Sequence, residues 1–398
     1  MLQHFSYVTA GESHGKGLVA IVEGMPAGTP IEADAIRRQL SRRQKGHGRG
    51  GRMKIERDAA EILAGVRLGE ALGSPIAMLI PNRDWENWQT AMSVAPLPDA
   101  SDEELRRVSL PRPGHADLVG LLKYGRSDAR DILERSSARE TAARVAAGAL
   151  ARALLTRFGI SVGSHVVSLA GVEARRLEPD EYPDDIGTAA DASPVRCLDS
   201  EAEKQMVAAI DTAKQKGDTA GGVFEVVARG VPVGLGSHVA ADRRLDGRLA
   251  GALMSIQAMK GVEIGLGFDA ARLPGSQVHD EIEADPTRRL SGGFRRRTNR
   301  AGGLEGGMTN GEPVTVRVAM KPLSTLMRPL RSVDLDSGQP AEAVRERSDV
   351  TAVPAAGIVG EAMVALVLAD AMREKFGGDS LREMEANYES YVELLQRR

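Results

Sequence analysis

A long apolar segment near the carboxyl end of the chain limits the folds that this sequence can adopt. Ile358 to Ala369 is apolar apart from Glu361, and helical periodicity extends over Ala355 to Phe376, up to Gly377 and Gly378. A helix that is apolar on all sides lies either in the core of a large protein or across a membrane. Because no run of about 18 apolar residues occurs, we expect a buried core helix and no membrane partner.

The composition is that of an ordinary globular protein, with 42% hydrophobic and 27% charged residues. The length of 398 residues exceeds the limit of about 250–300 residues for one hydrophobic core, which leaves two domains or one large multilayer domain. No strong linker divides the sequence, so we treat residues 1–398 as a single domain. A net charge of −3 and an aromatic content of 3% argue against a nucleic-acid partner.

Cysteine content and the first residues bear on the location of the protein. Cys197 is the only cysteine, which excludes an intramolecular disulfide and a cysteine-based metal cluster. Gln3 and His4 stand where a signal peptide would carry basic residues. We therefore expect a reducing, cytoplasmic location.

Helical and strand-like segments alternate irregularly along the chain. Such a pattern favours a layered α+β architecture over a doubly wound sheet, and no Gly-x-Gly-x-x-Gly follows a strand. Ser137 and Glu140 have the spacing of a capping box at the start of an Ala-rich helix. The acidic stretch from Leu177 to Ala192 predicts an exposed excursion. The other predicted helices are Ala33–Arg43, Ala138–Phe158 and Leu245–Met259, and the predicted strands are Ile160–Leu169, Gly222–Val227 and Val314–Ala319.

Glycine-flanked histidines and clustered arginines are the residues most suited to chemistry. In Gly11 to Gly17, His14 lies on a turn after a short strand-like run, where its charge can change near neutral pH. From Lys45 to Arg52, arginines flank glycines whose backbone N–H groups can form an anion-binding nest. A solvated basic loop and an RGG-like nucleic-acid segment are the alternatives for this second stretch.

Two further segments place such groups at predicted helix starts. His115 follows Gly114 and precedes Asp117, either beside the helix amino terminus or simply as a helix-start residue. Arg135, Ser136 and Ser137 form a phosphate site or a plain N-cap. Asp349 follows an arginine-rich run, as a base or as a surface ion pair. Together these residues favour a small anionic ligand, with a histidine as general acid and a carboxylate as general base. No metal-ligand spacing is present.

Seven segments, in order, resemble the chorismate synthase family over essentially the whole chain. They are Gly11–Glu12–Ser13–His14–Gly15 through Met25–Pro26, Arg112 to Asp117, Glu134 to Thr141, Met254 to Gly261, Gly302 to Gly307, Lys321 to Thr325, and Arg347–Ser348–Asp349 through Met363. The resemblance implies an α+β domain with helices sandwiched between two antiparallel sheets, and a homotetramer.

The resemblance also implies an activity, the last step of the shikimate pathway. In that step 5-enolpyruvylshikimate 3-phosphate loses phosphate and a ring proton in an anti-1,4 elimination to give chorismate. The family needs reduced FMN although the reaction is redox-neutral. Some relatives reduce the flavin with NADPH, whereas others depend on a separate flavin reductase, and the sequence does not separate the two kinds.

Family roles transfer to matching positions. His14 matches the histidine that protonates the leaving phosphate, His115 the one near the anionic edge of the flavin, and Asp349 the carboxylate that relays the ring proton through flavin N5. Arg43 and Arg49 match NADP positions, although they also suit the anionic groups of the substrate. The positions that match FMN contacts are Arg135, Ser136, Ser137, Gln257, Ala258, Gly306, Lys321, Pro322, Leu323, Ser324, Thr325 and Arg347.

Two positions depart from a common form of the family pattern. Ser348 stands where many relatives have His, and Gln257 where some have Asn. Both leave Asp349 and the amide chemistry intact. The competing functions are an anion-binding or nucleic-acid-binding module, which would bind polyanions without flavin, and a phosphoryl- or enolpyruvyl-transferring enzyme, which would need a second substrate.

Overall fold

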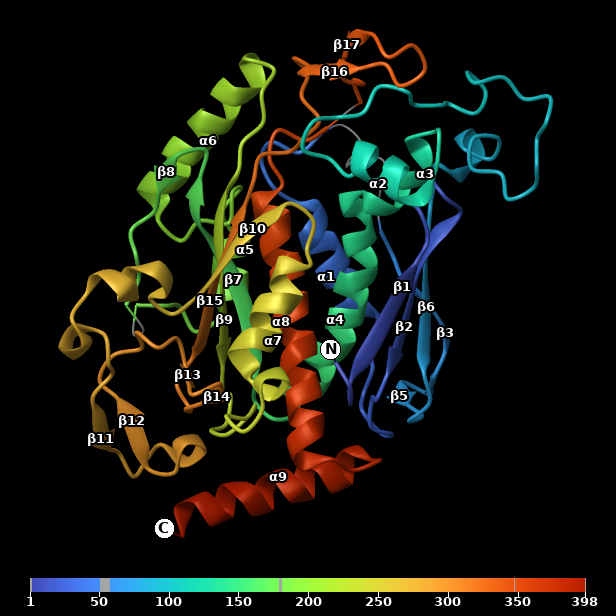
Figure 1. Ribbon diagram of the computed structural model, residues 1–398. Helices are drawn as coiled ribbons and strands as arrows, with labels where there is room; N and C mark the ends of the chain where they lie inside the picture. The colour runs from blue at the N-terminus through green and yellow to red at the C-terminus, as the bar shows by residue number, and fades with distance from the viewer. Residues whose placement is uncertain (1, 51–57, 179–180, 347, 398) are drawn as a thin grey trace.

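Two antiparallel sheets enclose a layer of helices in the computed structural model, which describes residues 2–50, 58–178, 181–346 and 348–397 (Figure 1). The first sheet has the strand order β1-β2-β6-β3 and the second the order β10-β15-β9-β7-β8. Their strands are β1 Ser6–Ala10, β2 Gly17–Glu23, β3 Glu61–Ala64, β6 Ile76–Pro81, β7 Ser161–Leu169, β8 Val172–Glu173, β9 Gly222–Arg229, β10 Met259–Ile264 and β15 Val314–Met320. The predicted α+β sandwich is confirmed.

The helices between the sheets connect the two halves of the core. In the middle layer α4 packs against both α1 and α8, while α8 also contacts β7 and β9 and α4 contacts β2. The longest of these, α8, is buried along nearly its whole length, as its composition predicts. The bounds of all the α-helices in the described residues, inside and outside this layer, are α1 Ala33–Gln44, α2 Asp117–Tyr124, α3 Arg130–Ser136, α4 Thr141–Thr156, α5 Ile186–Asp191, α6 Ser200–Gln215, α7 Leu245–Met254, α8 Val353–Phe376 and α9 Leu381–Gln396.

Short hairpins project from this core. In Figure 1, β16–β17 lies at the upper end of the molecule, near α2 and α3, and β11–β12 and β13–β14 lie toward the lower end, near α9. The bounds of these strands are β4 Val66–Arg67, β5 Glu70–Ala71, β11 Ile282–Ala284, β12 Phe294–Arg296, β13 Leu304–Glu305, β14 Met308–Thr309, β16 Arg331–Val333 and β17 Pro340–Glu342.

Close approach of α4 and α8 depends on small side chains. A Cβ built on Gly148 of α4 would lie 2.4 Å from the Cβ of Ala362 on α8. The Ala-rich face predicted for α4 therefore packs as expected, with Ala142, Ala146 and Ala149 buried. By length and hydropathy α8 is also a candidate membrane span, but its apolar window is wholly buried inside the protein, which is the position of a core helix.

A charged group is buried in the middle of α8. Glu361 of α8 accepts hydrogen bonds from Arg42, Arg152 and Arg196 and from the Ser164 hydroxyl. Burial raises the pKa of its carboxyl, but the three guanidinium charges outweigh that effect and hold the pKa below its usual range. The single charged residue in the apolar segment is thus an internal ion-pair centre.

Three local predictions were wrong. The residues Ala138–Glu140 form a 3-10 turn before α4, and Ser137 accepts from the Arg139 N–H without a capping box, because Glu140 is taken up by tertiary partners. Helix α7 ends at Met254 because the chain turns through Ala258, whose φ is 69°. The excursion after Leu177 contains the partly buried α5, whose backbone approaches Gly163 of β7 closely.

Candidate active site

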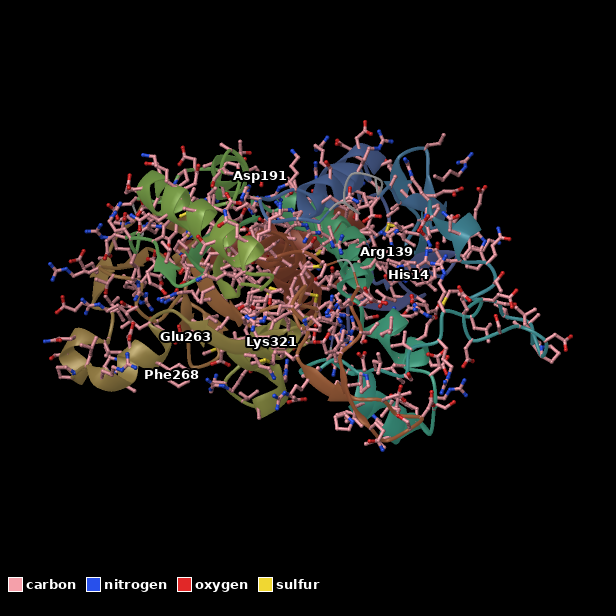
Figure 2. The ribbon with its side chains drawn as sticks, turned by 90° about the horizontal axis from the view of Figure 1, so that it is seen from above. His14, Arg139, Asp191, Glu263, Phe268 and Lys321 are labelled. Atoms are coloured by element: carbon pink, nitrogen blue, oxygen red, sulfur yellow. The ribbon has the colours of Figure 1, made fainter. Side chains whose placement is uncertain are left out.

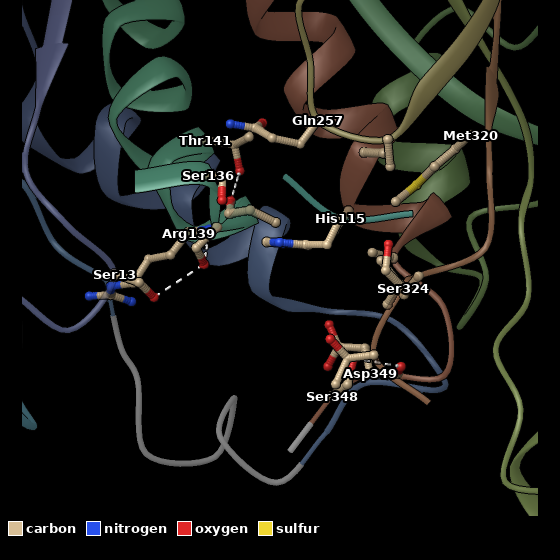
Figure 3. A pocket seen from close by; sticks show the side chains of 18 of the residues that line it. Ser13, His115, Ser136, Arg139, Thr141, Gln257, Met320, Ser324, Ser348 and Asp349 are labelled. Carbon is tan, nitrogen blue, oxygen red and sulfur yellow. Dashed lines mark hydrogen bonds between the residues drawn. The ribbon is translucent and has the colours of Figure 1, made fainter. Parts of the chain in front are cut away.

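A cavity of about 570 Å³ lies where α3, α4 and α8 meet the ends of several loops. Figure 3 shows side chains from widely separated parts of the chain arranged around it, among them His115, Arg139, Gln257 and Asp349. Its volume is within the range of small-molecule sites. The predicted residues that line it are His14, Arg43, Arg49, His115, Ser136, Ser137, Gln257, Ala258, Lys321, Leu323, Ser324, Thr325 and Asp349.

Three of the predicted residues that the structure describes do not line this cavity. Arg135 lines a neighbouring hollow, where its guanidinium donates to the carbonyl oxygens of Thr9 and Gly11 at 2.8 and 3.1 Å. Gly306 lies in the turn between β13 and β14. Pro322 is the neighbour of lining residues without lining the cavity itself. Arg347 lies outside the described residues.

His14 is held by a carboxylate from α3. Its Nδ1 lies 2.8 and 3.0 Å from the two carboxylate oxygens of Glu134, and its backbone N–H donates to the same group at 2.8 Å. Arg130 donates to Glu134 from one helical turn earlier. Burial raises the pKa of the Glu134 carboxyl, but the hydrogen bonds from His14 and the charge of Arg130 outweigh burial and lower it. The ring is therefore fixed through Nδ1.

His115 has the same kind of support from a different element. Its Nδ1 donates to Asp117, the first residue of α2, which is fully buried. Arg112 donates to Asp117 from its backbone N–H, Nε and Nη2. Burial opposes ionisation of Asp117, but the bonds from His115 and Arg112 hold the pKa of its carboxyl well below the usual range. Asp117 is thus more than a helix-start residue.

Asp349 lies across the cavity beside the glycine-rich loop. Its carboxylate accepts the backbone N–H of Gly50 at 2.6 Å and lies 2.9 Å from Nη1 of Arg49. The loop therefore engages an anion through both a backbone amide and an arginine, as a nest would. In this structure that anion is the carboxylate of the chain itself.

Arg43 has a different environment from Arg49. Its Nε donates to the Thr141 hydroxyl and its Nη2 to the Ala138 carbonyl, both at 2.9 Å. Asp58 lies 3.5 Å from Arg43 and 3.0 Å from Arg139. Arg139 also lines the cavity, although it was not among the predicted site residues. These contacts tie α1 to the start of α4.

Gln257 and Ala258 form an irregular edge of the cavity. Gln257 donates from Nε2 to Glu140 at 3.0 Å, whereas its buried Oε1 has no hydrogen-bond partner among the described residues. Ala258 adopts the left-handed backbone conformation, which is strained for a residue with a Cβ. Unsatisfied and strained groups of this kind concentrate at binding sites.

A lysine completes the cationic lining. Nζ of Lys321 donates to the Ser324 hydroxyl at 2.9 Å, and that hydroxyl donates to the Gly114 carbonyl at 3.0 Å. Burial, followed by the charge of Lys260, lowers the pKa of Lys321. Seen from above, Lys321 lies between His14 and Arg139 on one side and Glu263 and Phe268 on the other (Figure 2). The cavity thus presents cations from several directions to an anionic ligand.

Comparisons with known proteins identify the family of this chain. The family model described as chorismate synthase matches residues 5–373. The chain belongs to the chorismate synthase family. It is 59% identical over 394 residues to the chorismate synthase of Geobacter sulfurreducens, covering 98% of this chain and 99% of that protein. It is 60% identical over 390 residues to the one from Moorella thermoacetica, with 98% and 99% coverage.

A solved structure gives the same family. A crystal structure of chorismate synthase aligns over 100% of both chains with a TM-score of 0.79 and 45% sequence identity. The protein is therefore an enzyme, a carbon–oxygen lyase that acts on phosphate. Membership in the chorismate synthase family confirms the resemblance drawn from the seven segments.

Sequence reasoning missed the residues that support the two histidines. Glu134 lies within the segment Glu134 to Thr141, which resembles the family, but no role was predicted for it. Arg112 and Asp117 lie within another such segment, and no contact with His115 was predicted for them. Trp88, whose ring stacks on His14, lay outside every segment. The tertiary structure brings Glu134 and Trp88 to His14, whereas Arg112 and Asp117 are neighbours of His115 in sequence.

Proposed function

We propose that this protein converts 5-enolpyruvylshikimate 3-phosphate to chorismate by anti-1,4 elimination of phosphate and a ring proton, with reduced FMN and no net redox change. The observation that carries this proposal is the shared cavity of His14, His115 and Asp349 in a member of the chorismate synthase family. An elimination of phosphate needs a proton donor for the leaving group and an acceptor for the ring proton. Both kinds of group line one cavity.

The residues around the cavity fit a flavin. Gln257 Oε1 is a buried acceptor without a donor among the described residues, and the isoalloxazine ring carries N–H groups of the kind it lacks. The hydroxyls of Ser136 and Ser137 and the segment from Lys321 to Thr325 are the further groups proposed to hold it. When bound, reduced FMN supplies electron density to the allylic system and recovers it.

The cationic lining suits a substrate with a phosphate and two carboxylates. Arg49, Lys321 and Arg139 line the cavity, and planar guanidinium groups bind such anions in bidentate fashion. Between the two uses left open for Arg49, its contact with Asp349 supports the substrate over NADP. For Arg43, the bonds to Thr141 and Ala138 support a role in holding α1 on α4.

His14 is the proposed general acid. Since Nδ1 is engaged by Glu134, the proton given to the departing phosphate oxygen comes from Nε2. Glu134 stays in place as the carboxylate that orients the ring. The proposed role of His115 is to present Nε2 to the anionic edge of the cofactor, because its Nδ1 is held by Asp117.

Asp349 is the proposed proton acceptor. Gly50 and Arg49 contact its carboxylate, which fixes its position at the cavity wall. Positioning of this kind is what general-base catalysis requires. Ser348 contributes a hydroxyl to the lining next to it.

The assembly, location and source of reducing power stay predictions from the sequence. They are a homotetramer, a cytoplasmic location, and either intrinsic NADPH-dependent flavin reduction or a separate reductase. An anaerobic comparison of NADPH and dithionite as reductants separates the last two, because an enzyme without reductase activity turns over with dithionite alone.

The proposed reaction is tested anaerobically with purified protein, the substrate and dithionite-reduced FMN. We expect equal amounts of phosphate and chorismate, with no acceptor added. A requirement for a second substrate would indicate a transferase, and binding of polyanions without turnover would indicate a binding module.

A further inference from the structure

The indole ring of Trp88 lies against the imidazole of His14. Their ring centroids are 3.7 Å apart and the ring planes are inclined by 22°, which is a stacked arrangement. Trp88 follows the short 3-10 turn Trp85–Asn87, in the long connection between β6 and α2. No motif that carried the function includes this tryptophan.

Hydrogen bonds fix the segment before Trp88 to the turn that carries His14. The side-chain amide of Asn82 donates to the Gly15 carbonyl at 2.9 Å, and its backbone N–H donates to the Lys16 carbonyl at 3.1 Å. Nε1 of Trp88 donates to Asp84 at 2.9 Å, and the Asp84 N–H donates back to Asn82. The indole and the imidazole are therefore anchored to one common frame.

Cationic side chains gather on the same indole ring. The guanidinium carbon of Arg106 lies 4.0 Å from the ring centroid and that of Arg130 lies 5.2 Å from it. The described charged groups that contact the stacked pair also include Glu134, at Nδ1 of His14, and Asp84, at Nε1 of Trp88. An aromatic face attracts cations, so the two guanidinium groups help to hold the indole in place against the imidazole.

We propose that Trp88 is a positioning residue that holds His14 for proton donation, with Glu134 fixing the ring at Nδ1 and the indole fixing its plane. This inference rests on the proposed function of His14 as the general acid. The flat indole face keeps the ring from turning about its side-chain bonds, so that Nε2 keeps one direction.

The stack has a spectroscopic signature that needs neither substrate nor cofactor. Protonated imidazole quenches the fluorescence of a tryptophan that it contacts, whereas neutral imidazole quenches it much less. The chain has two tryptophans, so Trp85→Phe leaves Trp88 as the sole emitter. In this variant we expect fluorescence to rise with pH in one transition as His14 loses its proton. Adding His14→Gln should abolish the transition.

Activity then distinguishes positioning from plain packing. Trp88→Phe keeps a flat aromatic face and should retain most of kcat, whereas Trp88→Leu should lower kcat by roughly 10-fold. Because the imidazole keeps its contact with Glu134 at Nδ1 but loses the surface that fixes its plane, the loss in Trp88→Leu should fall on kcat and leave KM for the substrate little changed. Trp85→Phe is the matched control and should behave like the unaltered enzyme.

Two results would overturn this inference. One is a fluorescence transition that persists in the His14→Gln protein, which would mean that Trp88 does not sense His14. The other is a Trp88→Leu enzyme that folds, as judged by circular dichroism, and keeps the kcat of the unaltered enzyme. If the unaltered enzyme forms no chorismate while the transition depends on His14, the proposed function fails but the stacked pair stands.

Discussion

The carboxylate of Glu134 binds His14 twice, through the ring Nδ1 at 2.8 Å and through the backbone N–H at 2.8 Å, although the two residues are 120 positions apart. Arg130, one turn earlier on α3, donates to the same carboxylate. One buried acid therefore sets both the location of the amino-terminal turn and the orientation of its imidazole. The proposed proton donation by His14 depends on this contact.

Replacement of Glu134 should impair catalysis less than replacement of His14 itself. His14→Gln removes the general acid and should lower kcat by about 10²–10⁴-fold. Glu134→Gln keeps the shape but loses the charge beside the ring, and should lower kcat by about 10-fold. Anaerobic steady-state kinetics measure both. Glu385 pairs with Arg157 at the surface, so Glu385→Gln is the control. A Glu134→Gln enzyme with the kcat of the unaltered enzyme would contradict the role of Glu134.

Asp117 should contribute stability that depends on pH. Because its pKa is lowered in the folded state, its contribution is complete above the ordinary value of 3.8 and is lost as the pH falls through the lowered value. Asp117→Asn should lower the free energy of unfolding by about 3 kcal/mol at neutral pH. The difference in free energy of unfolding between the variant and the unaltered protein should narrow as the pH falls below about 4.

Urea unfolding at several pH values tests this. Asp336→Asn is the control, because Asp336 pairs with Arg107 at the surface and its replacement should produce no comparable gap. If the difference in free energy of unfolding between Asp117→Asn and the unaltered protein widened at low pH, the stabilising role of the ionised Asp117 would be contradicted.

Two glycine substitutions in helices should have opposite effects. Gly148→Ala would place a Cβ 2.4 Å from that of Ala362 and should lower the free energy of unfolding by about 1–3 kcal/mol. Gly251→Ala, within α7, meets nothing within 4 Å and should raise it by about 0.4–1 kcal/mol. Thermal or urea unfolding measures both. Tolerance of Gly148→Ala would show that α4 and α8 are not packed as closely as described.

Arg43 and Arg49 should separate into a structural and a ligand-binding residue. Arg43→Met removes donors to Thr141 and Ala138 and should lower the free energy of unfolding by about 2–3 kcal/mol. Arg49→Met should instead lower kcat/KM by about 10-fold or more, with a smaller effect on unfolding. Urea unfolding and steady-state kinetics of both variants test this. A large loss of kcat/KM in Arg43→Met and a large loss of stability in Arg49→Met would exchange the two roles.

The fold was largely predictable because its helices carry strong local signals. The bounds of α8 and the burial of its apolar segment follow from composition and from Gly377. The start of α4 was not predictable locally. Glu140 has the spacing of a capping box with Ser137, but it is bound instead by Arg144, one helical turn later, and by Thr9 and Gln257, which only the tertiary fold brings to it.

Much of the site was predictable from the resemblance, and its support was not. His14, His115 and Asp349 lie around one cavity as expected. The carboxylate that orients His115 is its near neighbour Asp117, whereas the one that orients His14, Glu134, reaches it from a helix 120 residues away in sequence. Periodicity and spacing carry no information about such long-range contacts.

The division of labour between His14 and Asp349 is the central claim, and a deuterium isotope effect tests it most directly. Substrate deuterated at the ring position that loses its proton is compared with unlabelled substrate in the unaltered enzyme, His14→Gln and Asp349→Asn. In Asp349→Asn we expect a large loss of kcat together with an increased isotope effect, because proton removal becomes rate-limiting. In His14→Gln the loss of kcat should come without that increase. Near-normal turnover of Asp349→Asn with saturating reduced FMN, or an unchanged isotope effect, would contradict the assignment of the base.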